Sequence, residues 1–212
     1  RALEFQKFPS ENVTGIIHRV TFPVLSSVQD DKKKLEIIFR KFIRLSAFVI
    51  FPMMIGLAVV AEPLIRLILT EKWISVVPLL QLLCISGMLY PLHAININVL
   101  KVKGRSDLVL KLEVIKKIII VIAILITFSF GVKALIIGQI FTSIIGFFVN
   151  THYSEKMVNY GPWKQIKDVI PVFLITLFMA LGVWIAMLIV DNDALKLLTG
   201  VVVGIILYIL AR

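Results

Sequence analysis

The feature that most constrains how this chain folds is a series of long apolar runs separated by polar connections. The runs cover residues 45–61, 75–100, 118–130, 134–149, 169–190 and 194–211. Most of them approach the ~20 residues that a helix needs to cross ~30 Å of hydrocarbon. The sequence therefore predicts an all-α fold, a polytopic transmembrane helical bundle.

Lysine and arginine alternate between rich and poor connections along the chain. Six basic residues lie between positions 32 and 44, six between 101 and 117, and three between 156 and 167, whereas the connections between these stretches carry one or two each. By the positive-inside rule, the basic connections face the cytoplasm and the sparse ones face outward. Hydropathy and charge agree on about seven membrane helices, provided that residues 12–29 also cross.

Residues 12–29 are the hardest segment to assign. They are long enough to span a bilayer but contain His18, Arg19, Thr21 and Pro23, which lower their hydropathy. Two interpretations compete, an interfacial amphipathic helix and a membrane helix with a polar face turned to a water-filled cavity. Hydropathy alone leaves the choice open; we favour the membrane helix on the family resemblance given below, since an arginine inside a span normally faces protein or water.

Composition excludes several classes of protein. With 59% hydrophobic and 17% charged residues, the 212-residue chain is too apolar for a soluble domain. The net charge of +10 is divided among separate loops, so we expect anionic membrane lipids rather than nucleic acid as the partner. Cys84 is the single cysteine, which rules out an internal disulfide and a cysteine metal site, and we expect no cofactor or metal.

Catalytic signatures are missing from the loops. The sequence shows no serine–histidine–aspartate set, no metal-ligand spacing and no glycine-rich phosphate loop. The outward connections, near residues 62–74, 131–133 and 191–193, are short, and a membrane enzyme would have little room there for acids, bases or metals. Polar residues inside kinked spans favour a transporter.

Two groups of polar residues inside apolar runs are candidate site residues. His93 and Asn96 are three residues apart and share a helix face, which suits either a polar substrate or an interhelical hydrogen bond. Glu113, Lys116 and Lys117 fall within the span that must begin near residue 111. Glu113 can neutralise either lysine along the helix, and the lysines either snorkel to the interface or form a cationic cavity wall.

Glycine spacing predicts where helices approach each other closely. Gly138, Thr142 and Gly146 recur every four residues, as do Gly200 and Gly204, giving two faces of small residues. We interpret both faces as structural.

Several short stretches occur in a fixed order over the first half of the chain. They are TFPVLS at 21–26, QDD at 29–31, FP at 51–52, AEPLI at 61–65, KW at 72–73 and KGRSDL at 103–108. Their order and spacing resemble the polysaccharide-exporting branch of the multidrug/oligosaccharidyl-lipid/polysaccharide flippase superfamily. Residues 130–212 resemble it mainly in hydropathy.

The resemblance implies a two-lobe fold of which this chain is the second lobe, with the N-terminal lobe as its partner. The chain begins at Arg1 without methionine or signal peptide, and we expect it to be part of a longer protein. We divide it into a partial C-terminal-lobe bundle (1–152), a cytoplasmic interfacial linker (153–168) and a terminal helix pair (169–212).

The resemblance also implies transport of an undecaprenyl-diphosphate-linked oligosaccharide across the bacterial inner membrane by alternating access. His18 and Arg19 would line the cavity and, with Lys116 or Lys117, hold the diphosphate. His93 and Asn96 would meet sugar hydroxyls, and Glu113 is the candidate for ion coupling. The alternatives are a drug or small-solute antiporter, which favours a carboxylate-lined cavity, and an enzyme of envelope glycan synthesis.

Overall fold

The computed structural model describes residues 15, 17 and 19–211. Residues 19–27 are helical and precede α2. The elements that follow are α2 (Lys32–Val59), α3 (Ala61–Leu69), the short 3-10 helix η1 (Glu71–Val76), α4 (Val77–Val102), α5 (Ser106–Thr127), the 3-10 turn η2 (Phe128–Phe130), α6 (Val132–Val158), α7 (Pro162–Leu188) and α8 (Asp193–Leu210). No strand occurs in the described part of the chain, which confirms the all-α prediction.

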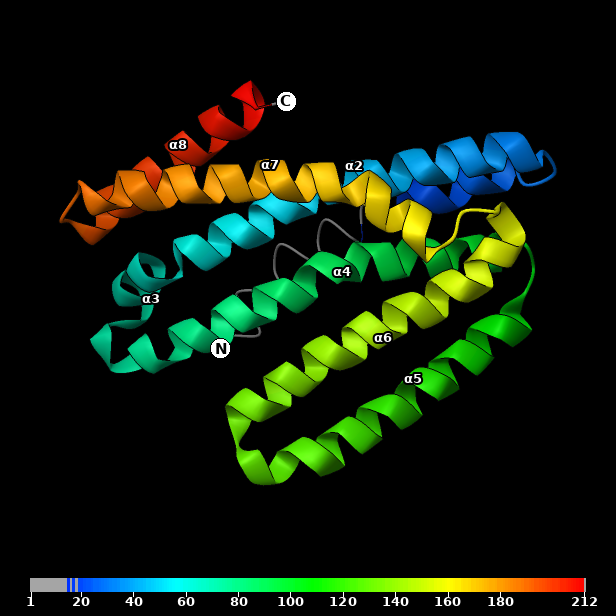
Figure 1. Ribbon diagram of the computed structural model, residues 1–212, viewed down its shortest axis with the longest axis horizontal. Coiled ribbons are helices and arrows are strands. Elements are labelled where there is room, and N and C mark those ends of the chain that lie inside the picture. The colour runs from blue at the N-terminus through cyan, green and yellow to red at the C-terminus, as the bar shows by residue number, and fades with distance from the viewer. Residues whose placement is uncertain (1–14, 16, 18, 212) are drawn as a thin grey trace.

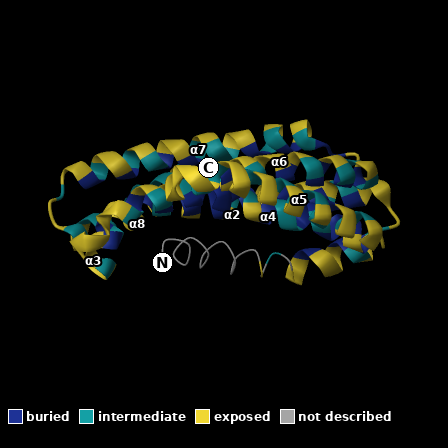
Figure 2. Ribbon diagram, turned by 90° about the horizontal axis from the view of Figure 1, so that it is seen from below, coloured by how far each residue is buried: buried dark blue, intermediate teal, exposed yellow. Residues whose placement is uncertain are grey.

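The long helices pack side by side in a bundle (Figure 1). Helices α2 and α4 form its centre: α2 packs against α4 and α7, α4 against α6, and α5 forms a hairpin with α6 at one edge. Large apolar side chains remain exposed on α5 to α8, and the outer faces of the helices are largely exposed (Figure 2). A bilayer supplies the apolar surroundings that such a surface needs.

Five helical segments are long and apolar enough to span a membrane: Lys32–Val59, Glu71–Val102, Val132–Val158, Pro162–Leu188 and Asp193–Leu210. They coincide with five of the seven predicted spans. Helix α5 corresponds to a sixth predicted span, but it is not among these five segments. Its first half carries the charged residues that the sequence analysis placed in the membrane or at its edge. The seventh predicted span, residues 12–29, lies partly outside the described residues.

The terminal helix α8 packs against α7 and α2 through small residues. A Cβ atom on Gly200 would lie 2.9 Å from Cγ1 of Val60, and one on Gly204 would lie 3.3 Å from Cγ2 of Val183. Near its end, α8 is bonded to α2 because the hydroxyl of Tyr208 donates to the carbonyl of Phe48 at 2.7 Å. The predicted packing role of Gly200 and Gly204 is confirmed.

Two connections that the sequence assigned to loops are largely helical. The expected linker at 153–168 consists of the ends of α6 and α7, separated by residues 159–161. Asn159 ends α6 in a left-handed conformation with φ of 54°, which asparagine tolerates well. The outward connection at 62–74 forms α3 and η1, and α3 is supported by an ion pair between Glu62 and Arg66 at 2.9 Å.

The charge alternation makes a direct prediction about topology. A cysteine placed at the exposed Lys33, in a full-length protein without other cysteines, should be protected from an impermeant thiol reagent added to intact cells. It should react after the cells are permeabilised. Labelling in intact cells would place this loop outside and overturn the orientation.

Candidate functional site

Arg19 lies on the outer surface of the lobe. In the helical segment 19–27, Thr21 and Leu25 are fully buried, whereas Arg19 is exposed. Thr21 and Leu25 are one helical turn apart and face the bundle, so Arg19 lies on the exposed side of this segment. His18, its predicted companion, lies outside the described residues.

Three of the predicted site residues come together between α4, α5 and α6. Nε2 of His93 lies 3.2 Å from Oγ of Ser143, and the amide nitrogen of Asn150 lies 3.0 Å from Nδ1 of His93. Lys116 on α5 donates to the carboxylate of Glu113 one turn away. A Cβ atom built on Gly146 would lie 3.5 Å from His93 Cε1 and 3.8 Å from Lys116 Cδ, so the imidazole and the lysine stem share the space above this glycine.

This polar cluster, defined as His93, Glu113, Lys116, Ser143 and Asn150, lies away from the ends of the helices. Lys116 is ten residues from the start of α5 and His93 nine from the end of α4, about 15 Å along each helix. The carboxylate of Glu113 offsets the charge of Lys116, and the side chain of Lys116 is only 19% exposed. Lys117 is exposed instead, so it is the better placed of the two lysines for an external anion.

Gly146 provides a test of this arrangement. Alanine at this position would make ordinary contacts with His93 and Lys116, whereas leucine would force both side chains to move. In the full-length protein in detergent, we expect Gly146→Leu to lower the free energy of unfolding by about 1–3 kcal/mol and Gly146→Ala to have little effect. Equal thermal stability of the two variants would show that the space above Gly146 is not restricted.

Asn96 is completely engaged in a buried hydrogen-bond network. Its amide nitrogen donates to the carbonyl of Leu92 at 2.8 Å and to Oε1 of Gln165 at 3.1 Å, and its oxygen accepts from Ser154 and from Gln165. These four bonds use the full capacity of the amide, which leaves no group for a sugar hydroxyl. The network joins α4, α6 and α7, so the structure favours the interhelical alternative for Asn96.

A second cluster, which the sequence analysis missed, joins α2 to the start of α7. Asp168 accepts from Arg40 through Nε and Nη2, from Arg44 through Nη2 and from the hydroxyl of Tyr160. The Asp168 side chain is 7% exposed, whereas those of Arg40 and Arg44 are about half exposed. We call these four residues the Asp168 cluster.

Tyr160 completes this cluster from the connection between α6 and α7. Its ring is buried and packs edge-on against Phe39 of α2, with centroids 5.9 Å apart. Burial, followed by the hydrogen bond to Asp168, raises the pKa of Tyr160 well above its ordinary value. The phenol therefore stays neutral at cellular pH and acts as a donor to the carboxylate.

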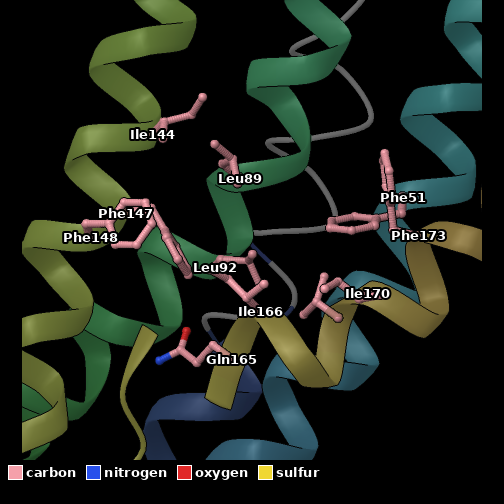
Figure 3. Close-up of a pocket in the computed structure, with 11 residues that line it drawn as sticks. Phe51, Leu89, Leu92, Ile144, Phe147, Phe148, Gln165, Ile166, Ile170 and Phe173 are labelled. Atoms are coloured by element: carbon pink, nitrogen blue, oxygen red, sulfur yellow. The ribbon is translucent and has the colours of Figure 1, made fainter. Parts of the chain in front are cut away.

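Two cavities lie between the membrane-spanning helices. One, of about 680 Å³, is lined by apolar residues of α2, α3, α7 and α8. The other, of about 240 Å³, lies between α4, α6 and α7 with Phe51 of α2 at one side (Figure 3). In the described part of the chain, no three histidine, cysteine or acidic residues are grouped to hold a metal ion.

Similarity to known proteins agrees with the architecture. The family described as polysaccharide biosynthesis protein matches residues 1–78. The lipopolysaccharide biosynthesis protein WzxC of Escherichia coli (strain K12) is 34% identical over 146 residues, which are 66% of this chain and 30% of WzxC. The teichuronic acid biosynthesis protein TuaB of Bacillus subtilis (strain 168) is 34% identical over 107 residues, 50% of this chain and 22% of TuaB.

A solved structure has the same fold. The lipid II flippase MurJ, in an inward closed conformation, matches with a TM-score of 0.74 and 20% identity, over 99% of this chain and 46% of MurJ. At this identity the match shows the fold alone. The chain spans about a quarter to a third of the length of the curated relatives. Motifs, relatives and fold agree: the chain is part of a multi-pass bacterial membrane protein that has the fold of a lipid flippase and is similar to polysaccharide biosynthesis proteins.

Proposed function

We propose that the chain is the C-terminal lobe of a transporter that moves an undecaprenyl-diphosphate-linked oligosaccharide from the cytoplasmic to the outer leaflet by alternating access. The observation that carries the proposal is that a lobe with the fold of a lipid flippase presents exposed cationic side chains, Arg19 and Lys117, on its membrane helices. Relatives named for lipopolysaccharide and teichuronic acid biosynthesis support a glycan substrate.

The chemistry of a diphosphate explains why cations are needed. Away from water, two phosphates require charge-assisted hydrogen bonds, while the polyprenyl tail stays in the bilayer. Arg19 is our first candidate because a guanidinium binds a phosphate through two parallel bonds, and Lys117 is the second. Lys116 is a weaker candidate because Glu113 already neutralises it. His18 keeps its proposed place beside Arg19.

The other predicted residues receive narrower roles. His93 and Asn96 are bonded within the lobe, and we assign them to packing rather than to sugar binding. The side chain of Glu113 is 46% exposed and stays our candidate for ion coupling, because a carboxylate at this depth is able to exchange a proton or bind a cation. The exposed cations Arg19 and Lys117 favour the glycan over a cationic drug.

Depletion of the full-length protein in cells distinguishes a flippase from a drug antiporter and from an enzyme of glycan synthesis. If it is the flippase, lipid-linked oligosaccharide should accumulate inside the cell while surface glycan falls, and the wild-type gene should restore both. A drug antiporter would leave surface glycan unchanged and alter drug resistance. An enzyme of glycan synthesis would deplete its lipid-linked product instead of accumulating it, and either of these results would contradict the proposal.

A further inference from the structure

The cavity between α4, α6 and α7 is closed at its base by residues that have no polar group to offer a ligand. Gln165 is the one polar lining residue. Its amide oxygen accepts a hydrogen bond from the side-chain nitrogen of Asn96. Its amide nitrogen donates to the side-chain oxygen of Asn96 and to the carbonyl of Tyr160, the latter at 3.2 Å. The remaining lining residues are apolar, and include Leu89, Leu92, Phe147 and Phe173. Only a hydrocarbon suits such a surface.

The cavity opens between α6 and α7. Helices α6 and α7 meet at the connection between them and then diverge (Figure 1). The Asp168 cluster and the Asn96 network hold the start of α7 against α2 and α4, so α7 is not free to close against α6. The wall residues Ile144, Phe148 and Ile170 are 40%, 38% and 46% exposed, and Figure 3 shows Ile144 and Phe148 on α6 across from Ile170 on α7.

The cytoplasmic rim of this opening is aromatic and basic. Trp163, in the first turn of α7, packs edge-on against Phe148 with centroids 6.2 Å apart. Lys167 is one turn after Trp163 on α7 and is exposed. Tryptophan and lysine at this position are typical of the level of the lipid head groups.

From these observations we infer that the cavity is a binding site for one anionic phospholipid of the cytoplasmic leaflet. An acyl chain fills the apolar space between α6 and α7, and the phosphate lies near Lys167. This lipid is distinct from the transported substrate, and it completes the packing where the two helices diverge. The site therefore depends on the membrane topology and not on the proposed transport activity.

For the test, the full-length protein is exchanged into detergent micelles that contain equal amounts of phosphatidylglycerol and phosphatidylcholine. Native mass spectrometry then counts the lipids that stay bound. The wild type should retain one phosphatidylglycerol. Ile144→Trp, at the mouth of the cavity, should lower this occupancy about tenfold by excluding the acyl chain. The matched control is Ile137→Trp, two turns earlier on the same face of α6 and 43% exposed, which should retain the lipid.

The charged rim is tested separately. Lys167→Gln should retain lipid but lose the preference for phosphatidylglycerol over phosphatidylcholine, whereas Lys133→Gln at the start of α6 should keep this preference. No retained lipid in the wild type, as expected if another protein segment covers the cavity, would overturn the inference. Equal occupancy in Ile144→Trp and Ile137→Trp would overturn it as well.

Discussion

Replacement of Asp168 by alanine in the full-length protein should increase tryptic cleavage between α6 and α7, at residues 156–164, by about fivefold or more. The carboxylate is 7% exposed and accepts bonds from two arginines and a buried tyrosine. Without the carboxylate, the guanidinium groups of Arg40 and Arg44 lose their shared acceptor and repel each other. The hydroxyl of Tyr160 also loses its hydrogen-bond acceptor. The expected loss is about 1–3 kcal/mol, and each 1.4 kcal/mol changes the open population ~10-fold.

The measurement uses inside-out membrane vesicles, in which the cytoplasmic side is accessible to trypsin. Asp191→Ala is the matched control, because Asp191 is an exposed carboxylate at the other end of α7. It should leave the cleavage rate unchanged. If the two variants are cleaved at the same rate, the Asp168 cluster does not hold α7 in place.

Arg19→Ala should abolish export of surface glycan while the protein level in the membrane stays near normal. The permanent charge of Arg19 lies on the exposed side of a segment that the flanking connections require to cross the membrane. In the proposed site, Arg19→Ala removes a side chain that can bind the diphosphate through two parallel hydrogen bonds. Arg19→Lys should be intermediate, because an ammonium keeps the charge but not the paired geometry.

The control for this variant is Arg66→Ala. Arg66 is also an exposed arginine, but it pairs with Glu62 on the outward α3 helix. We expect normal export. Normal export by Arg19→Ala, or a full-length structure in which Arg19 reaches the lipid interface away from any cavity, would reduce this residue to a membrane anchor.

The membrane architecture was predictable because it depends on properties of long segments. Apolar runs and alternating basic connections average over many residues, so single polar positions do not change the result. The spacing of Gly200 and Gly204 was also informative, because small residues one turn apart on a helix favour the close approach of a neighbouring helix. The fold of the lobe therefore followed from local patterns.

The polar contacts were harder to predict because their partners are distant in the sequence. Asn96 meets Gln165, which lies in a stretch that reads as a polar linker, and Asp168 meets Arg40 across 128 positions. A single sequence gives the helix face of each residue but not the neighbouring helix. The one available signal for Asp168 was an acid placed directly before an apolar run and among basic residues.

The assignment of charges inside α5 shows the same limit. The pairing of Glu113 with Lys116 follows from their i, i+3 spacing, and the structure confirms it. The placement of both Lys116 and His93 above Gly146 depends on how α4, α5 and α6 pack. This arrangement could therefore not be predicted from the sequence.

The central claim is that the full-length protein carries lipid-linked oligosaccharide to the outer leaflet. The most direct measurement is the fraction of this lipid that an impermeant glycosidase reaches on intact spheroplasts, with ligation to the final polymer blocked. With the wild-type protein, we predict that most of the oligosaccharide is cleaved, and that depletion of the protein or Arg19→Ala leaves it protected. Equal cleavage in the presence and absence of the protein would contradict the account.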